Sequence, residues 1–422
     1  MDLKPTSTFA WSIVGVSFVT LALTYAVWYS FSIFFVSLLK EFYWTRSVAS
    51  GAFSIFVIFH GISGLLAGSM VNRHGPRIAL LLGSLFLGGG LILCSFTQTW
   101  WQFYIFFGVI AAAGVGTTGW VPNTTIIQNV FKAKRGLAMG IISSGIGVGI
   151  LVCVPLFQFL IIRLGWRKTY QIMAFFIPLI ICAMATLFLK KPPRPSFLQD
   201  TEAPPPSREI KNSLPVAKSA EMSWTFRQAM TTKQFWLLGL SFFLGAFAVH
   251  SILTHHVAFL IDQGVEILTA SSIVGILGIV SVGGKIFWGV LSDRIGREST
   301  YTAGIICLTL GISFLIIYDI SPRFFLPYSY AFFLGMGYAA TATLSPLIAA
   351  DFFAGHAYGS IFGTLFILNG IGGALGAWFA GFLYDRIGSY IPSFITMIAF
   401  SLFACLSIWL AAPRKIRIQQ VR

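Results

Sequence analysis

Twelve long apolar stretches, separated into six and six by one polar segment, limit what this chain can fold into. A helix that crosses a bilayer needs about 20 mostly apolar residues. Because no water is available inside a bilayer, each stretch must pair its own backbone groups and is expected to be helical. The sequence therefore predicts an all-α membrane protein with twelve transmembrane helices in two six-helix bundles. The stretches lie at residues 11–39, 46–70, 77–97, 101–130, 136–162, 168–189, 234–261, 268–291, 300–318, 324–350, 357–383 and 389–411.

The segment between the sixth and seventh stretches, residues 190–233, is rich in proline and charged residues and cannot lie in hydrocarbon. It is predicted to be an extended linker with a short surface helix near residues 224–230. We therefore expect three regions along the chain. These are an N-terminal six-helix bundle at 1–190, a cytoplasmic linker at 191–232, and a C-terminal bundle with a short basic cytoplasmic tail at 233–422.

The composition excludes a soluble or disordered chain, because 56% of residues are hydrophobic and 10% are charged, against about 25% in soluble domains. A formal charge of +15 would indicate nucleic acid as a partner of a soluble protein. With the N-terminus in the cytoplasm, however, 20 of the 28 basic residues fall on the cytoplasmic side and seven on the other. Basic residues favour cytoplasmic loops. We therefore expect a multi-pass inner-membrane protein with both termini cytoplasmic and no nucleic-acid partner.

The five cysteines lie singly inside apolar stretches, without a CxxC pair. This spacing favours packing residues over disulfides or a zinc site. Neither a metal nor a cofactor is expected, and the chain also carries no phosphate-binding loop or nucleophile motif. A membrane enzyme, a receptor and a channel are therefore less favoured than a transporter. We expect a monomer whose partners are the lipid bilayer and a small solute.

A loop with the pattern G-x-x-x-[DN]-R-x-G occurs at the same place in each half, after the second and the eighth stretch. Glycine permits a sharp turn and close helix approach, and the charges can pair with helix ends. The alternative is a simple turn whose charges extend to water. Because there are two copies, we expect the loops to hold the cytoplasmic side closed in an outward-open state. Their residues are Gly68, Asn72, Arg73, Gly75 and Arg77, and Gly289, Asp293, Arg294, Gly296 and Arg297.

The sequence contains two further repeated features. Residues 381–388 form a third copy of the loop, and glycine-rich runs occur at 144–149 and 369–376. With the paired loops and the long linker, these features resemble the major facilitator superfamily. The segments 25–35, 41–47, 51–54, 283–289 and 372–376 resemble, more narrowly, bacterial monocarboxylate transporters and their oxalate/formate antiporter relatives.

Lys285 is the basic residue that lies inside a stretch, about 12 Å along the helix from the cytoplasmic boundary. An ionisable residue at this depth indicates function, unless its long side chain extends to water. The equivalent place in the first half is Gly64. The resemblance implies that Lys285 binds the substrate carboxylate, at a position where the family usually carries Arg.

No Asp or Glu lies near the middle of a stretch, which disfavours cationic substrates and leaves Lys285 without a counter-ion. Desolvation disfavours the charged amine, and an arriving anion would restore it. Proton and anion uptake would then be coupled through Lys285, with His250 as a second proton-coupling candidate. A lone histidine is, however, more often a packing residue, which is how we interpret His60. His255 and His256 lie near the outer end of their stretch, where water is the simplest partner.

Further polar or aromatic side chains are expected to line the pathway, because transporter sites combine both halves at the midplane. Pro122 and Pro346 mark kinked stretches. The expected substrate-binding residues are Lys285, Tyr25, Trp28, Tyr29, Asn123, Ser144, His250, Tyr338 and Asn369.

The predicted function is secondary active transport of a small monocarboxylate, such as lactate or pyruvate, by alternating access and with a proton. The oxalate antiporter branch carries a second cation in the eleventh span, whereas residues 358–378 here hold no Lys or Arg. One cation balances one carboxylate, which favours a monoanion. The alternatives are an anion exchanger of the oxalate/formate type and a transporter of another organic anion.

Overall fold

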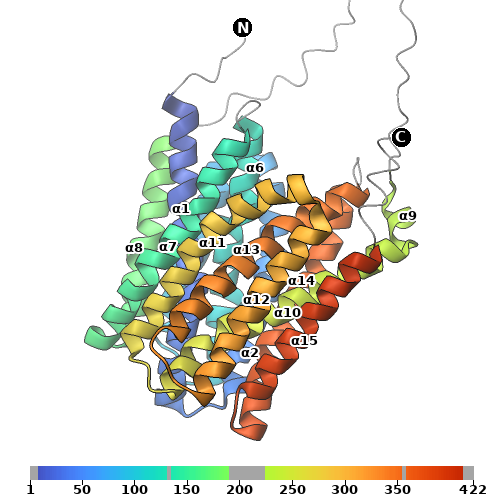
Figure 1. The fold of residues 1–422 in the computed structure, drawn as a ribbon. Helices are drawn as coiled ribbons and strands as arrows, with labels where there is room; N and C mark the ends of the chain where they lie inside the picture. The colour runs from blue at the N-terminus through green and yellow to red at the C-terminus, as the bar shows by residue number, and fades with distance from the viewer. Residues whose placement is uncertain (1–7, 131–134, 190–223, 354–357, 412–422) are drawn as a thin grey trace, which may run out of the picture.

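The computed structural model describes residues 8–130, 135–189, 224–353 and 358–411 (Figure 1). Within these ranges the chain is helical, without a strand, and twelve helical segments are long and apolar enough to cross a membrane. The predicted all-α class and the twelve spans are confirmed. Most of the predicted linker lies outside the described residues. Its last part contains the expected short helix, α9 (Phe226–Met230), capped at Thr225 by a reciprocal bond with Gln228.

The first six spans contain one interrupted helix, because the fourth span is divided into four pieces. The second piece is π-helical, and α5 and α6 are separated at Gly119, three residues before Pro122. The elements are α1 (Thr8–Phe42), α2 (Arg46–His74), α3 (Pro76–Cys94), α4 (Trp100–Phe103), η1 (Tyr104–Ala111), α5 (Ala112–Thr118), α6 (Trp120–Val130), α7 (Arg135–Leu164) and α8 (Trp166–Phe188).

The last six spans are continuous helices. Pro346 lies inside the tenth span, which it does not interrupt. The elements are α10 (Lys233–Asp262), α11 (Ile267–Ile295), α12 (Arg297–Ile320), α13 (Leu326–Phe353), α14 (Tyr358–Ile387) and α15 (Ile391–Ala411).

The repeated loops have the same backbone geometry. Gly75, between α2 and α3, has φ 89° and ψ 161°, and Gly296, between α11 and α12, has φ 92° and ψ 160°. This region of backbone space is essentially restricted to glycine. The sequence repeat therefore encodes the same tight turn in each half, and Gly165, between α7 and α8, adopts nearly the same geometry (φ 83°, ψ 160°) outside the repeat.

The glycine-rich runs also pack in the same way in both halves. A Cβ atom at Gly145 or Gly149 of α7 would lie 2.5 or 2.1 Å from the carbonyl oxygens of Phe18 and Ala22 in α1. At Gly372 and Gly376 of α14 it would lie 2.2 Å from the carbonyl oxygens of Phe243 and Phe247 in α10. Small residues allow helix backbones to approach this closely inside lipid. The pairs α1–α7 and α10–α14 are therefore equivalent contacts.

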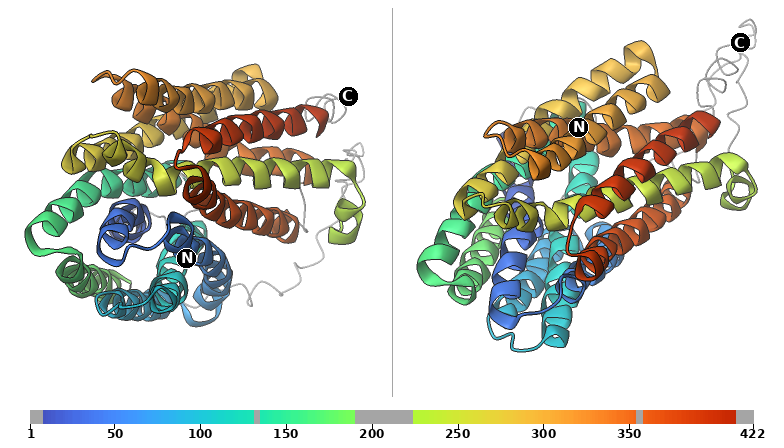
Figure 2. Two further views of the ribbon diagram at one scale, coloured as in Figure 1. Left: turned by 90° about the horizontal axis from the view of Figure 1, so that it is seen from below. Right: turned by 60° about the horizontal axis from the view of Figure 1, so that its bottom comes forward.

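The two halves meet mainly where α7 packs against α11 and α2 packs against α14. Seen from below, α1 is viewed nearly end-on, whereas α10 and α15 run across the view, so these helices of the two halves are tilted against each other (Figure 2). We call the side where α1 ends and α2 begins the distal side, and the side where α8 ends and α10 begins the linker side.

Candidate functional site

Six of the nine predicted substrate-binding residues form one cluster where the halves meet. Tyr25, Trp28 and Tyr29 come from α1, His250 from α10, Lys285 from α11 and Tyr338 from α13. The helical spacing of residues 25, 28 and 29 places their side chains on one face of α1. The cluster therefore draws on both halves, as expected for a transporter site.

The polar end of the cluster is formed by two tyrosines and one lysine. The Tyr29 hydroxyl donates to the Tyr338 hydroxyl at 2.8 Å, which joins the two halves. The Lys285 ammonium lies 5.9 Å from the centre of the Tyr338 ring. Because Tyr338 accepts from Tyr29, its own hydroxyl proton is left to donate to another group. Lys285 makes no ion pair among the described residues. The hydroxyl of Tyr338 and the ammonium of Lys285 are therefore two donors suited to a single anion.

The apolar wall of the cluster is aromatic. Trp28 makes edge contacts with Phe53, Phe56, His60 and His250, at centroid distances of 5.6, 5.1, 4.7 and 6.0 Å. The Nδ1 atom of His250 lies 2.9 Å from the carbonyl oxygen of Ala246. That bond fixes Nδ1 as the donor in neutral His250 and leaves Nε2 as an acceptor.

His60, which the sequence suggests is a packing residue, lies with Phe53 and Phe56 on the face of α2 that meets Trp28. Neither phenylalanine is among the residues expected from the sequence. The available signal was their spacing, since positions 53, 56 and 60 share one helical face. The sequence therefore shows an aromatic face on α2, at positions 53, 56 and 60, and another on α1, at positions 25, 28 and 29.

The other three predicted residues use their side-chain donors on backbone carbonyls. The Asn123 amide donates to Thr118 and Gly119 at 2.7 and 2.8 Å, which satisfies carbonyls freed by the break between α5 and α6. Ser144 donates to Ile141 in its own helix at 2.6 Å, and Asn369 donates to Phe242 of α10 at 3.3 Å.

Asn123 nevertheless supports the site. Tyr25 interacts with the backbone of Trp120, the first residue after the break, and a Cβ at Gly119 would lie 3.6 Å from His60 Nε2. The break in the fourth span therefore borders the cluster, and Asn123 holds its backbone in place. The sequence marked this place through Pro122.

The predicted lock loops lie on the linker side. Arg297 bonds to Asp293 at 2.9 Å, to Asp351 of α13 at 3.4 Å, and to Ser292. This half of the device therefore ties α11, α12 and α13 together. Gly68 allows close approach of α6, since its Cβ would lie 3.1 Å from Val121, whereas Gly289 has more room. Exposed side chains belong to Arg73, Arg77 and Arg294, and the side chain of Asn72 lies outside the described structure.

On the distal side, Arg46 bridges the halves, a role the sequence did not reveal. Its guanidinium pairs with Asp262 at 2.7 Å, bonds to the Tyr390 hydroxyl at 2.5 Å, and lies 3.7 Å from the Tyr384 ring centre. The backbone N–H groups of Arg46 and Ser47 each donate to Asp385 at 2.8 Å. We call this group, Arg46 with Asp262, Tyr384, Asp385 and Tyr390, the distal clamp.

The expectation that His255 and His256 face water is wrong. Both are almost fully buried. His255 bonds to the Tyr390 hydroxyl at 3.0 Å and to the Ala377 carbonyl at 2.9 Å, and His256 bonds to the Tyr330 hydroxyl. Both ring nitrogens of His255 thus have partners, so its neutral imidazole can be buried at low cost, whereas Nε2 of His256 has no hydrogen-bond partner among the described residues. Within the described ranges, no three His, Cys, Asp or Glu side chains gather into a metal-ligand set.

Twelve spanning helices around a central site with aromatic walls and a basic end define a multi-pass membrane transporter. The sequence model of the Major Facilitator Superfamily matches residues 17–377 and 269–420, and the chain belongs to that superfamily.

The relatives carry more specific names. Monocarboxylate transporter 12 of Rattus norvegicus is 26% identical over 408 residues, which cover 93% of this chain and 83% of that protein. Monocarboxylate transporter 13 of Rattus norvegicus is 25% identical over 431 residues, which cover 98% of this chain and 94% of that protein. The crystal structure of the nucleoside transporter NupG has the same fold, with a TM-score of 0.75, 14% identity, and coverage of 96% of this chain and 100% of that chain.

Proposed function

We propose that the chain transports a small monocarboxylate across the membrane by alternating access. The observation that carries the proposal is the pair of donors formed by Lys285 and Tyr338, with Tyr29 orienting Tyr338 from the other half. A carboxylate beside them would accept from both and supply the missing counter-charge. The names of the relatives support the same substrate class.

The aromatic wall limits the rest of the substrate. The rings of Tyr25, Trp28, His60 and His250 contact one another and form a mostly apolar surface, against which a short organic tail would pack. A single cation in the cluster supports a monoanion over oxalate, the substrate class of the alternative exchanger. His250 Nε2 is the acceptor most suited to a substrate hydroxyl or a coupled proton.

We further propose that the segments 1–190 and 233–422 rock about this cluster, with residues 191–232 linking them. Polar contacts between the halves run from the centre, at Tyr29 and Tyr338, through Ser54 and Ala374, to the distal clamp. These contacts support a state closed on the distal side. The excess of basic residues on the linker side supports placing that side, and both termini, in the cytoplasm.

The test is a binding panel on the purified full-length protein. Lactate, pyruvate, acetate and oxalate are titrated while the melting temperature is followed, because a ligand that binds the native state raises it. We expect monocarboxylates to stabilise the wild type and Lys285→Gln to abolish the effect. Lys40→Gln, an exposed lysine on the distal side, is the matched control and keeps the wild-type response. If no carboxylate shifts the wild-type melting temperature, the substrate class is wrong.

Proton coupling has its own experiment. Vesicles that contain the protein and a pH-sensitive dye are exposed to the monocarboxylate identified above, and proton and substrate fluxes are compared. Arg stays protonated in proteins, so Lys285→Arg retains the positive charge without a titratable proton. We expect this variant to lose coupled proton movement. Wild-type stoichiometry in Lys285→Arg would exclude Lys285 as the proton site and leave His250.

A further inference from the structure

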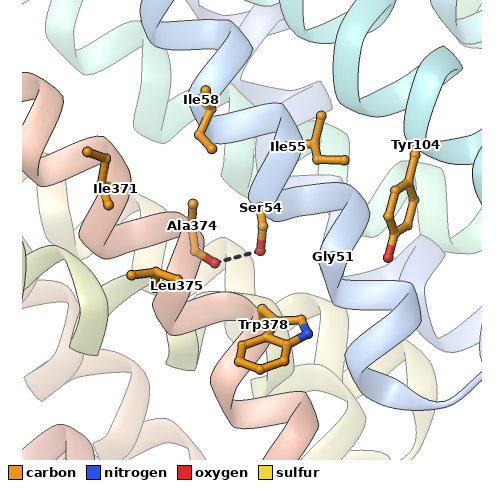
Figure 3. A pocket seen from close by; sticks show the side chains of 9 residues that line it. All are labelled: Gly51, Ser54, Ile55, Ile58, Tyr104, Ile371, Ala374, Leu375 and Trp378. Atoms are coloured by element: carbon orange, nitrogen blue, oxygen red, sulfur yellow. Dashed lines mark hydrogen bonds between the residues drawn. The ribbon is translucent and has the colours of Figure 1, made fainter.

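A hollow of about 370 Å³ opens on the flank of the protein, between α2 and α14, and is separate from the central cluster. Figure 3 shows Ser54 of α2 facing Ala374 of α14, with Trp378 at one end. Its lining residues are Gly51, Ser54, Ile55, Ile58, Tyr104, Ile371, Ala374, Leu375 and Trp378.

The depth of the hollow can be calculated from the helix ends. The 29 residues of α2 extend about 44 Å, so about 7 Å projects beyond a ~30 Å hydrocarbon core at each end. Gly51 lies about 8 Å from the distal end of α2, and Ile371 about 24 Å from the distal end of α14. The hollow therefore extends from the distal edge of the hydrocarbon to just beyond its middle, which is the depth of one leaflet.

The lining offers almost nothing to a polar ligand. The Ser54 hydroxyl donates to the Ala374 carbonyl at 2.5 Å, and the Tyr104 hydroxyl donates to the Val48 carbonyl at 2.7 Å. Water needs two to four polar partners in a buried site. The remaining N–H group belongs to Trp378, the α14 lining residue nearest the distal side, where indoles commonly meet lipid. The occupant is therefore apolar.

The mouth of the hollow opens sideways, toward the lipid. Ile58, Ile371 and Leu375 are 42%, 41% and 45% exposed, on helices that cross the membrane. A dry cavity of about 150 Å³ holds benzene, so this hollow has room for a chain of on the order of ten carbons. We propose that an acyl chain of a phospholipid in the distal leaflet occupies the hollow between α2 and α14.

Because the hollow lies between the two halves, a lipid bound in it would affect transport; this inference rests on the rocking motion proposed above. The α2 and α14 helices belong to opposite halves, and one hydrogen bond, from Ser54 to Ala374, crosses the floor of the hollow. A tail bound here contacts both halves in the distal-closed state. Opening of the distal side would remove one wall of the site and release the tail.

The test measures lipid occupancy and does not depend on substrate. The full-length protein is reconstituted in phosphatidylethanolamine and phosphatidylglycerol vesicles with a trace of phosphatidylcholine carrying a photoreactive diazirine within one acyl chain. After irradiation, labelled peptides are located by mass spectrometry. We expect labelling of residues 51–58 and 371–378 to exceed, several-fold, that of residues 402–410 of α15, which contain five large apolar side chains at least 45% exposed.

Two filling variants make the assignment specific. Ile58→Trp and Leu375→Trp each place a larger side chain in the hollow without removing the bond between Ser54 and Ala374. Both are expected to lower labelling at the α2–α14 hollow to the level of α15. Leu85→Trp, at a 70% exposed position on α3, is the matched control and leaves the pattern unchanged. Equal labelling of the hollow and α15 in the wild type would overturn the proposal, as would cross-linking of a second copy of the chain through these residues.

Discussion

Replacing Arg46 by Gln tests whether the distal clamp holds one state of the protein. The substitution removes the ion pair with Asp262, the charged hydrogen bond to Tyr390 and the stacking on Tyr384. The two bonds from backbone N–H groups to Asp385 remain. The local fold is therefore kept while the side-chain part of the clamp is lost.

The free-energy change expected for Arg46→Gln can be added up from the separate contacts that the substitution removes. Asp262 is 36% exposed, so its ion pair contributes about 0–1 kcal/mol. A hydrogen bond from a charged donor adds ~1.5–3 kcal/mol, and a partly exposed cation–π contact ~0.5–1 kcal/mol. Glutamine recovers part of the hydrogen bonding, which leaves a loss of about 2–3 kcal/mol. At ~1.4 kcal/mol per factor of ten, the equilibrium shifts by about 30- to 150-fold toward the distal-open state.

The assay is a distance measurement between spin labels placed on opposite halves at the distal side. Tyr43, in the turn between α1 and α2, and Phe324, between α12 and α13, are 89% and 83% exposed. Both are replaced by cysteine in a background without the five native cysteines. We expect the wild type to show mainly the short distance and Arg46→Gln to show mainly a longer one.

A matched control separates the clamp from a general loss of charge. Arg163 also lies on the distal side, and its guanidinium stacks on Phe159 of the same helix. Arg163→Gln should therefore leave the distance distribution as in the wild type. An unchanged distribution in Arg46→Gln, in protein that melts like the wild type, would refute the clamp.

Three further predictions concern packing, turn geometry and the lock. Gly147→Ala places a Cβ 2.2 Å from Val282 and 2.6 Å from the Gly278 carbonyl across the halves, so we expect a loss of about 1–3 kcal/mol by denaturation. Gly140→Ala, which meets nothing within 4 Å, should be neutral. Gly296→Ala forces a side chain into glycine-only backbone space and should cost about 1–3 kcal/mol, whereas Gly283→Ala, in open space, should not. Asp293→Asn removes a partner of Arg297 and should raise the inward-open population, measured by cysteine accessibility from both sides of the membrane. The same accessibility in Asp293→Asn as in the wild type would count against the lock.

The positions of the spans could be predicted because hydrocarbon imposes both a length and a composition. The helices agree with the apolar stretches but extend past several of them, as α12 does by starting at Arg297 instead of residue 300. The extra turn of α12 begins with the polar residues Arg297, Glu298 and Ser299, which the search for apolar stretches leaves out. The π-helical piece at Tyr104–Ala111 could not be predicted, because its composition is as apolar as that of an ordinary helix.

Part of the central site could be predicted, because charged and polar groups inside a span are costly unless they have partners. Lys285 is conspicuous because a charge inside a span is costly, and Tyr29 and Tyr338 because their hydroxyls need partners. Polarity alone could not separate these from Asn123, whose amide instead satisfies its own backbone. The role of Arg46 cannot be predicted from the sequence, because Arg46 stands next to a loop, where basic residues are common, and its partners lie more than 200 positions away along the chain.

The hydrogen bond between Tyr29 and Tyr338 has a consequence for the direction of transport. It joins the halves near the middle of the membrane, and atoms close to a rotation axis move least when two rigid bodies rock. Lys285 and Tyr338 would then offer the same donors, at nearly the same spacing, to solute arriving from either side. Equal affinity on both sides predicts the same half-saturating solute concentration for uptake and for efflux. Net flux would be set by the gradients of the solute and the proton alone, and labelled solute should exchange across vesicles that hold no gradient.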